Sequence, residues 1–138
     1  MQPLAMDFKY LHRVTYAETD QMGFMHHSNY LRMYENARWE SFRELGISYK
    51  YVENNNIIMP VIDLQLHFIK PAFYDDSLTI TTRIMEIKGA KIDFHYTTLN
   101  SSNKIINTAT IVVACVNKTN KKPIRFPEFL HKKLLICT

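Results

Sequence analysis

One long helical segment followed by a series of alternating strands is the feature that most limits the folds open to this chain. Over residues 28–45, five apolar side chains lie near one face of an amphipathic helix: Leu31, Tyr34, Ala37, Phe42 and Leu45. After the asparagines at 54–56 the period changes to two. Because helix and strands are segregated along the chain, this order predicts an α+β fold with a mainly antiparallel sheet.

Five segments are expected to form the strands of that sheet. They cover residues 8–16, 62–68, 78–88, 90–99 and 105–117. The centre of the last segment, residues 109–116, is almost continuously apolar. This predicts a central strand that is buried on both faces or covered on one face by a partner subunit. A single helix covers only one face of such a sheet, so the other face must meet water, a ligand or a second subunit.

Polar residues, glycine and proline mark the expected ends of the helices. Ser28 or Asn29 can cap the start of the long helix, and Gly46 can end it. A short turn is expected over residues 48–53, and a last short helix is expected to open near Pro127. The chain therefore has one dominant helix and two accessory ones.

The size and composition of the chain are those of one globular domain. Its 138 residues, 46% of them hydrophobic, suffice for a core, and we expect a single domain over residues 1–138. No apolar run is long enough to span a membrane, and the first residues lack the apolar centre of a secretory signal. The expectation is a soluble cytoplasmic protein with no membrane insertion.

Basic residues gather late in the chain and contribute much of the net charge of +4. They are Lys118, Lys121, Lys122, Arg125, Lys132 and Lys133. A solvated basic surface explains them, and so does a patch for a phosphorylated ligand. No nucleic-acid-binding motif accompanies the charge, so a nucleic-acid partner is not expected.

The two cysteines do not indicate a disulfide or a metal site. Cys115 lies inside an apolar run and Cys137 is next to the C-terminal residue, which favours a buried thiol and a tail thiol over a disulfide. No spacing of cysteines and histidines is typical of zinc, and we expect no bound metal.

The segment between the first strand and the long helix carries the residues best suited to chemistry. Residues 19–30 read TDQMGFMHHSNY. This order places Asp20 close to a helix start, where unpaired backbone N–H groups and the positive end of the helix dipole gather. A fixed carboxylate beside a fixed N–H donor is a suitable arrangement for acyl transfer.

Each residue of this segment also has a purely structural explanation. An aspartate before a glycine is common in turns, so Asp20 and Gly23 can be simple turn residues. The side chains of His26 and His27 can act as base or ligand, or they can pack or face solvent. The main-chain N–H of His27 is of greater interest, because an N–H at a helix start has no internal acceptor and can donate to a substrate carbonyl.

The spacing of residues around this segment resembles that of the 4-hydroxybenzoyl-CoA thioesterase family, and most of all its YbgC-like acyl-CoA thioesterases. The residues that carry the resemblance are Arg13, Val14, Thr19, Asp20, Gly23, His27, Tyr30, Glu35 and Arg38. Weaker similarity continues through the later strands to Gly89 and to residues 125–127. The resemblance therefore covers nearly the whole chain.

The resemblance implies a hotdog fold, in which a curved antiparallel sheet of about five strands wraps a long central helix. Two such subunits pair into one longer sheet, so a homodimer or homotetramer with active sites at the subunit interface is implied. The family's catalytic carboxylate falls on Asp20. Its carbonyl-polarising N–H and its characteristic histidine side chain both fall on His27. The chain departs from the family at Phe24, Met25 and His26, which leaves the acyl group open.

The resemblance also implies hydrolysis of the thioester of an acyl-coenzyme A. No cofactor is needed, because coenzyme A is part of the substrate. Asp20 can attack the carbonyl directly or act as a general base on water, and the sequence leaves both routes open. The alternatives are a hotdog enoyl-CoA hydratase or dehydratase and a non-catalytic acyl-CoA-binding module. The hydratase needs a histidine placed for proton transfer at carbon, a motif that this helix start does not match.

Further residues are assigned to the site through the resemblance or through their charge. Glu35 is a reserve catalytic carboxylate, and an ordinary ion pair with Arg38 on the helix surface explains it equally. The residues expected to bind substrate are Tyr16, Gly23 and Tyr30 around the acyl group, and Lys88, Lys91 and Arg125 at the phosphates of coenzyme A.

Overall fold

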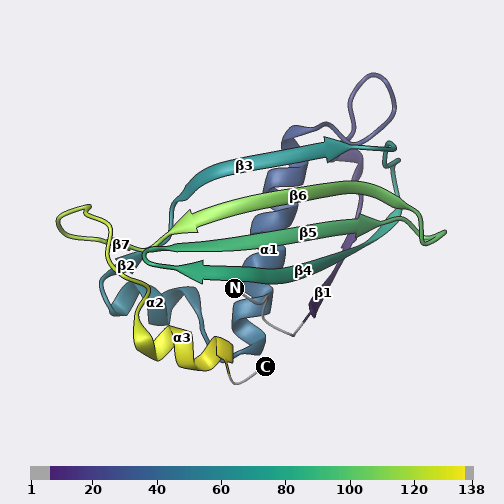
Figure 1. Cartoon of the computed structure of the whole chain (residues 1–138). Helices are drawn as coiled ribbons and strands as arrows, with labels where there is room; N and C mark the ends of the chain where they lie inside the picture. Colours follow the sequence, from purple (N-terminus) through teal and green to yellow (C-terminus); the bar gives the residue numbers. More distant parts are fainter. Residues whose placement is uncertain (1–6, 136–138) are drawn as a thin grey trace.

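The structure, a computed structural model that describes residues 7–135, consists of a long helix packed against a five-stranded antiparallel sheet (Figure 1). The helix is α1, Ser28–Glu44. The strands, in the order in which they lie in the sheet, are β1 (Asp7–Arg13), β4 (Ser77–Lys88), β5 (Lys91–Leu99), β6 (Ile105–Ala114) and β3 (Val61–Phe68). The predicted α+β class and antiparallel sheet are confirmed, and β1 and β3 form the two edges.

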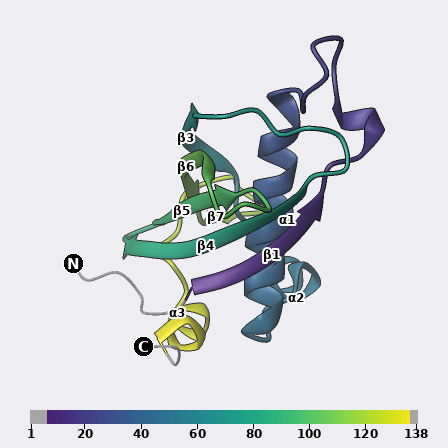
Figure 2. The ribbon, with the colours of Figure 1, turned by 90° about the vertical axis from the view of Figure 1, so that its right-hand side faces the viewer.

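Smaller elements complete the fold around the two ends of α1. They are η1 (Tyr16–Glu18), α2 (Tyr49–Asn54), α3 (Glu128–Leu135) and a small sheet of β2 (Ile57–Ile58) and β7 (Val116–Asn117). Figure 2 shows α1 on the inner side of the curved sheet, with α2 and α3 near the end of α1 that lies far from the η1 loop. The only long helix of residues 7–135 therefore begins at the same end of the molecule as that loop.

The first strand is shorter than predicted, because a local capping interaction ends it. The strand stops at Arg13 instead of continuing to residue 16, and the chain turns into η1. The Glu18 carboxylate accepts hydrogen bonds from the Thr15 N–H at 2.8 Å and from the Thr15 hydroxyl at 3.0 Å. This capping box takes the chain away from the sheet and toward the start of α1.

The predicted strand over residues 105–117 is divided at Cys115. β6 ends at Ala114, and after Cys115 the residues Val116 and Asn117 pair with β2 in the small sheet. The Cys115 N–H donates to the Ala90 carbonyl at 2.7 Å, and the Cys115 carbonyl accepts the Ile124 N–H at 2.9 Å. These bonds draw the chain out of the main sheet, so the predicted strand is wrong beyond Ala114.

The start of α1 differs from the expected cap, whereas the other predicted helix ends are confirmed. His27 precedes the helix and its side chain makes no capping hydrogen bond. The N–H of Ser28 donates instead to Nδ1 of His26 at 3.2 Å. Gly46 follows the helix with a φ of +79°, and the Ser48 hydroxyl caps α2 by accepting the Tyr51 N–H at 3.0 Å.

The buried face of α1 packs on the inward side chains of the sheet and forms the main core. Tyr30, Met33, Tyr34, Ala37 and Phe42 are each at most 2% exposed. The sheet residues opposite are as deeply buried, and the largest are Ile80, Ile84, Phe94, Tyr96 and Ile111. Each large side chain in such a core contributes about 1.5–3 kcal/mol by leaving water. This packing fixes the position of α1 on the sheet.

A polar group lies inside this core. The Tyr34 hydroxyl is 2.5 Å from Oδ1 of Asn107 and 2.9 Å from the Thr98 hydroxyl. All three side chains are fully buried. Burial raises the pKa of Tyr34 well above its usual range, so the phenol stays neutral and donates a hydrogen bond. The three residues join α1 to β5 and β6.

The ion pair with Arg38, the alternative explanation for Glu35, is absent from the ion pairs of the described residues. Glu35 is exposed, whereas Arg38 is only 5% exposed and points into the core. Its guanidinium donates to the Tyr96 hydroxyl at 3.4 Å and lies 5.8 Å from the centre of the Phe94 ring. The long stem of arginine can be buried among aromatic rings while its charge rests on a ring face.

Tyr34→Phe tests the internal polar group. The substitution removes one hydroxyl and leaves the Asn107 Oδ1 and the Thr98 hydroxyl without that partner in a dry core. We expect the free energy of unfolding to fall by about 1–3 kcal/mol, measured by urea denaturation.

The matched control is Tyr51→Phe. The Tyr51 hydroxyl makes no hydrogen bond to any other residue of the 7–135 region. Equal stability losses for the two variants, or none for Tyr34→Phe, would contradict the role of the hydroxyl.

Candidate functional site

The segment that the sequence singles out is a closed loop directly before α1. Thr19 and Met25 form an antiparallel β-bridge at the base of the loop. The Asp20 N–H donates to the Phe24 carbonyl at 3.1 Å, and the Gly23 N–H donates to the Asp20 carbonyl at 3.0 Å. These bonds close a tight turn, which Gly23 permits with a φ of +87°.

The Asp20 carboxylate is partly held by this turn. Its Oδ1 accepts the Met22 N–H at 2.9 Å, as in an Asx turn. Oδ2 has no hydrogen-bond donor among the residues that the structure describes. Asp20 is half-buried, so one oxygen is oriented by the backbone while the other is available to react.

The main-chain N–H of His27 has no acceptor within residues 7–135. Its neighbours are all paired: the His26 N–H donates to the Glu18 carbonyl at 2.8 Å, and the Asn29 N–H to the His26 carbonyl at 3.0 Å. His27 stands at the positive end of α1, where a free N–H attracts negative charge. This N–H is therefore suited to bind an oxygen on which charge develops.

Asp20 and His27 line the same cavity, which has a volume of about 560 Å³. Its other lining residues are mostly apolar: Met22, Phe24, Met25, Tyr30, Phe68, Ile69, Lys70 and Pro71. Burial raises the pKa of Tyr30 to about 12, so this wall stays uncharged near neutrality. A cavity of this size, apolar with a few polar groups, fits a small organic ligand.

The structure brings together only some of the residues assigned from the sequence. Asp20, His27 and Tyr30 share the cavity, and Gly23 shapes the adjacent turn without lining it. Tyr16 is 77% exposed and packs edge-on against Tyr74 outside the cavity. Glu35 lies in a second hollow with Arg38, between α1 and the start of β3.

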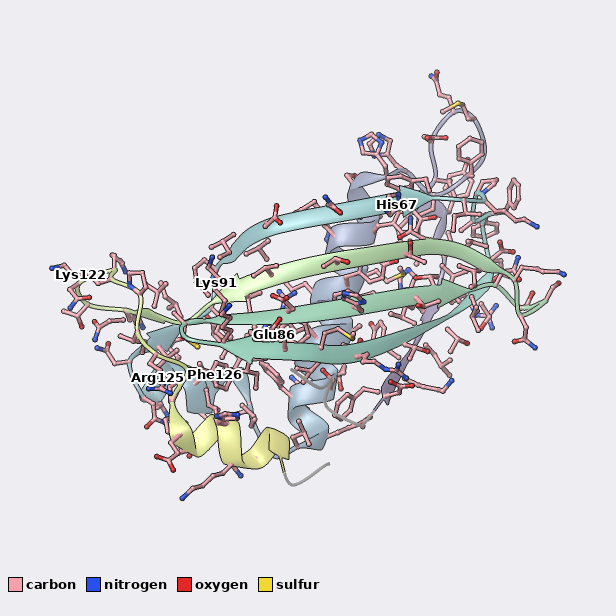
Figure 3. All side chains as sticks on the ribbon, viewed as in Figure 1. His67, Glu86, Lys91, Lys122, Arg125 and Phe126 are labelled. Carbon is pink, nitrogen blue, oxygen red and sulfur yellow. The ribbon has the colours of Figure 1, made fainter. Side chains whose placement is uncertain are left out.

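The three basic residues assigned to the site lie at the opposite end of the sheet. Lys88 and Lys91 flank the turn between β4 and β5 and share a hollow with Glu86 and Asp93. Arg125 lies next to this turn, because the Phe126 N–H donates to the Gly89 carbonyl at 2.8 Å. In Figure 3, Lys91, Lys122 and Arg125 appear at one end and His67 toward the other. Within one chain these cations are far from Asp20.

Two parts of the site were missed by the sequence reasoning. Residues 68–71 form one wall of the cavity. The sequence shows only a strand that ends at Pro71, which does not indicate a contact with the loop before α1. Glu18 makes hydrogen bonds on both sides of the loop, through its side chain to Thr15 and through its carbonyl to His26. The sequence prediction gave Glu18 no role. The sequence nevertheless contained an indication of this role, because Thr15 and Glu18 have the spacing of a capping box.

The remaining features of residues 7–135 do not add a reactive group to the cavity. Cys115 is buried, and burial raises the pKa of its thiol to about 12. Cys137 lies outside the described residues. Among the described residues, no three histidines, cysteines or carboxylates gather as a metal would require. No helix in this part of the chain is long and apolar enough to cross a membrane.

Comparison with known sequences gives consistent matches over most of the chain. The model of the thioesterase-like superfamily matches residues 14–134. A putative acyl-CoA thioesterase, YneP of Bacillus subtilis, is 35% identical over 113 residues, 82% of each chain. The acyl-CoA thioester hydrolase YbgC of Escherichia coli O157:H7 is 31% identical over 121 residues, 88% of this chain and 90% of that protein.

Solved structures match the fold as well. A DHNA-CoA thioesterase from Staphylococcus aureus is 30% identical with a TM-score of 0.86, covering 92% of this chain and 87% of that one. A hypothetical protein from Thermus thermophilus is 28% identical with a TM-score of 0.88, covering 95% of this chain and 99% of that one. The arrangement of the helix and the sheet is therefore found in other proteins.

Gly23→Ala tests the turn that holds Asp20. Apart from the chain neighbours of Gly23, no atom of the described residues lies within 4 Å of the position of an added Cβ, so the cost arises from the φ of +87° alone. We expect a loss of about 1–2 kcal/mol in the free energy of unfolding, measured in urea. Gly23→Asn should lose less, because asparagine tolerates this conformation better. Equal stability of Gly23→Ala and the parent protein would contradict the turn.

Proposed function

Because this chain belongs to the thioesterase-like superfamily, we propose that it hydrolyses acyl-coenzyme A thioesters with Asp20 and the main-chain N–H of His27. One observation carries the proposal: Asp20 and His27 line the same apolar cavity. Among the described residues, Oδ2 of Asp20 has no donor and the His27 N–H has no acceptor. The relatives YneP and YbgC, named as acyl-CoA thioesterases or thioester hydrolases, support the same reaction class.

The proposed reaction begins when the thioester oxygen accepts a hydrogen bond from the His27 N–H. That bond stabilises the negative charge that develops on oxygen as the carbonyl is attacked. In one route the Asp20 carboxylate forms a bond to the carbonyl carbon, the C–S bond breaks, and coenzyme A leaves as a thiolate. Water then cleaves the resulting anhydride and releases the acid. In the other route Asp20 takes a proton from water as the water attacks the carbonyl carbon. The C–S bond then breaks, and coenzyme A leaves as a thiolate that takes up this proton.

The walls of the cavity are suited to an acyl group. Tyr30 and Phe68 meet edge to face, with 5.3 Å between ring centres, and Met25 is buried beside them. Phe24 packs in the same manner on Phe73, with 6.3 Å between ring centres. Aromatic and thioether side chains adapt to either an aromatic or an aliphatic group. The cavity would exclude water from the acyl group and leave the carbonyl at its polar rim.

Asp20→Asn tests the proposed reaction. The amide keeps the acceptor for the Met22 N–H but can neither attack nor take a proton. We expect kcat/KM for acyl-CoA hydrolysis to fall by at least about 100-fold with little change in stability. A panel of short, long and aromatic acyl-CoAs supplies the substrates.

The matched control is Glu44→Gln, an exposed carboxylate at the far end of α1. It should retain the parent activity. Near-parent turnover by Asp20→Asn would reject the assignment. Hydration of an enoyl-CoA without cleavage of the thioester would favour the hydratase reaction instead.

We further propose that the active form is a homodimer joined along β3. This strand is an edge of the sheet, yet Val61, Ile62, Leu64 and Phe68 are between 42% and 56% exposed. A long apolar edge strand is unusual for a monomer, because its free N–H and C=O groups invite pairing. A two-fold axis at this edge would join two sheets into one, with the β3 strands antiparallel.

Such a dimer would bring the basic end of one chain to the cavity of its partner. The start of β3 lies at the basic end, since the Ala114 N–H donates to the Pro60 carbonyl and the Cys115 N–H to the Ala90 carbonyl. The end of β3, Phe68, lines the cavity. Antiparallel pairing sets the start of one β3 beside the end of the other. Lys91 and Arg125 would then bind the phosphates of a coenzyme A molecule in the partner's site.

Subunit complementation tests this arrangement. One chain carries Asp20→Asn, and the other carries Lys91→Glu with Arg125→Glu, which should raise KM for acyl-CoA. When the two chains are co-expressed, about a quarter of all sites should combine an intact carboxylate with intact cations and recover the parent KM.

The reciprocal control places all three substitutions in one chain and co-expresses it with the parent chain. Mixed dimers of that pair should contain no intact site. Parent homodimers alone should then leave about a quarter of all control sites intact. If the cations act within their own chain, about half of the control sites would be intact and the test pair would not recover the parent KM. A monomer in sedimentation velocity would contradict the dimer.

A further inference from the structure

We infer that Glu18 is a positioning residue that holds the loop and the first turn of α1 in the geometry the reaction needs. This inference rests on the proposed function, because it concerns the same site. Glu18 does not line the cavity and is not a catalytic residue. Its side chain and its carbonyl bind opposite flanks of the loop, so one residue connects β1, η1 and α1.

The Glu18 side chain fixes the entrance to the loop. Nε2 of His12, on β1, lies 3.0 Å from each carboxylate oxygen, and these two side chains are only 17% and 13% exposed. The N–H and hydroxyl of Thr15 complete the set at 2.8 and 3.0 Å. Charge-assisted hydrogen bonds of this kind are stronger than those between neutral groups. The carboxylate therefore ties η1 to the edge strand.

The protonation state of Glu18 fits this role. Burial opposes ionisation, but hydrogen bonds from Thr15, together with the charge and hydrogen bond of His12, hold the pKa of Glu18 below its usual range. The carboxylate is ionised near neutrality and both its oxygens are occupied. Glu18 therefore does not compete with Asp20, two residues later, as the reacting group.

The Glu18 carbonyl fixes the exit of the loop. It accepts the His26 N–H at 2.8 Å and the Asn29 side-chain amide at 2.9 Å. His26 and Asn29 stand on either side of His27, so both flanks of the proposed oxyanion donor are held by one oxygen. Because His26 already has this acceptor, the next N–H in the chain is the one left for the substrate.

This arrangement makes Glu18 important for rate more than for binding. The acyl group would bind to cavity walls that Glu18 does not touch. The distance between Asp20 and the His27 N–H, in contrast, depends on both ends of the loop. Misplacement by about 1 Å at a reacting group can cost about 100-fold in rate. Weakening the hydrogen bonds that Glu18 makes to both sides of the loop, which we call the Glu18 clamp, should therefore lower kcat and leave KM nearly unchanged.

Glu18→Gln tests the inference. Glutamine has nearly the same size but lacks the charge that binds His12 and Thr15. We expect kcat to fall by about 10-fold or more while KM changes less than about twofold, under conditions where the variant is fully folded by circular dichroism. His12→Gln leaves the Thr15 bonds in place and should cause a smaller loss in the same direction.

The control is Glu53→Gln, which removes a surface ion pair with Lys118, 2.9 Å long, at α2. It should leave kcat unchanged. An unchanged kcat in Glu18→Gln would overturn the inference. So would a loss of activity that only follows the fraction of unfolded protein.

Amide hydrogen exchange separates this inference from the proposed function. In Glu18→Gln the His26 N–H should exchange faster than in the parent protein, whether or not any acyl-CoA is hydrolysed, because the carbonyl that accepts it is less firmly held. Faster exchange in a protein that hydrolyses no acyl-CoA would support the clamp and reject the proposed reaction. Unchanged exchange at His26 would reject the clamp.

Discussion

The packing of α1 against the inner side of the sheet determines where every part of the candidate site lies. Five large or medium side chains of the helix are buried on the sheet, and the Tyr34 hydroxyl binds two strands at once. The helix therefore has little freedom to slide or rotate. Its N-terminus is held beside the end of β3. There the helix dipole and the His27 N–H, which has no acceptor among the described residues, meet an apolar cavity. The loop adds the carboxylate to a place that the core has already fixed.

The same packing leaves β3 exposed. One helix cannot cover the whole inner face of five strands, and β3, at the edge, has large apolar side chains on an open surface. The cavity, with Phe68 in its wall, lies at one end of this strand, and the basic turn lies near the other. We regard these three features as one arrangement. A second copy would cover the apolar edge and bring further cations to each cavity, which has Lys70 of its own.

The sequence predicted the parts of the structure that depend on local periodicity. The long helix and the main strands follow from apolar spacing, and the position of Asp20 before the helix follows from the motif. Contacts between distant segments could not be read in this way. The wall at residues 68–71 depends on how β3 meets α1, and the break at Cys115 depends on backbone bonds to Ala90 and Ile124. Arg38 lies four residues from both Tyr34 and Phe42, on the apolar face of α1, and only its contacts with Tyr96 and Phe94 of β5 explain how a charged side chain is buried there.

The central claim is that the thioester oxygen binds the His27 N–H beside Asp20. A crystal structure with an acyl-CoA analogue, in which a methylene replaces the thioester sulfur and the carbonyl is kept, tests it most directly. The account predicts that the carbonyl oxygen lies within about 3 Å of the His27 nitrogen, with the acyl group in the cavity and an Asp20 oxygen facing the carbonyl carbon. An acyl group in the cavity with its carbonyl turned away from the His27 N–H would contradict the account.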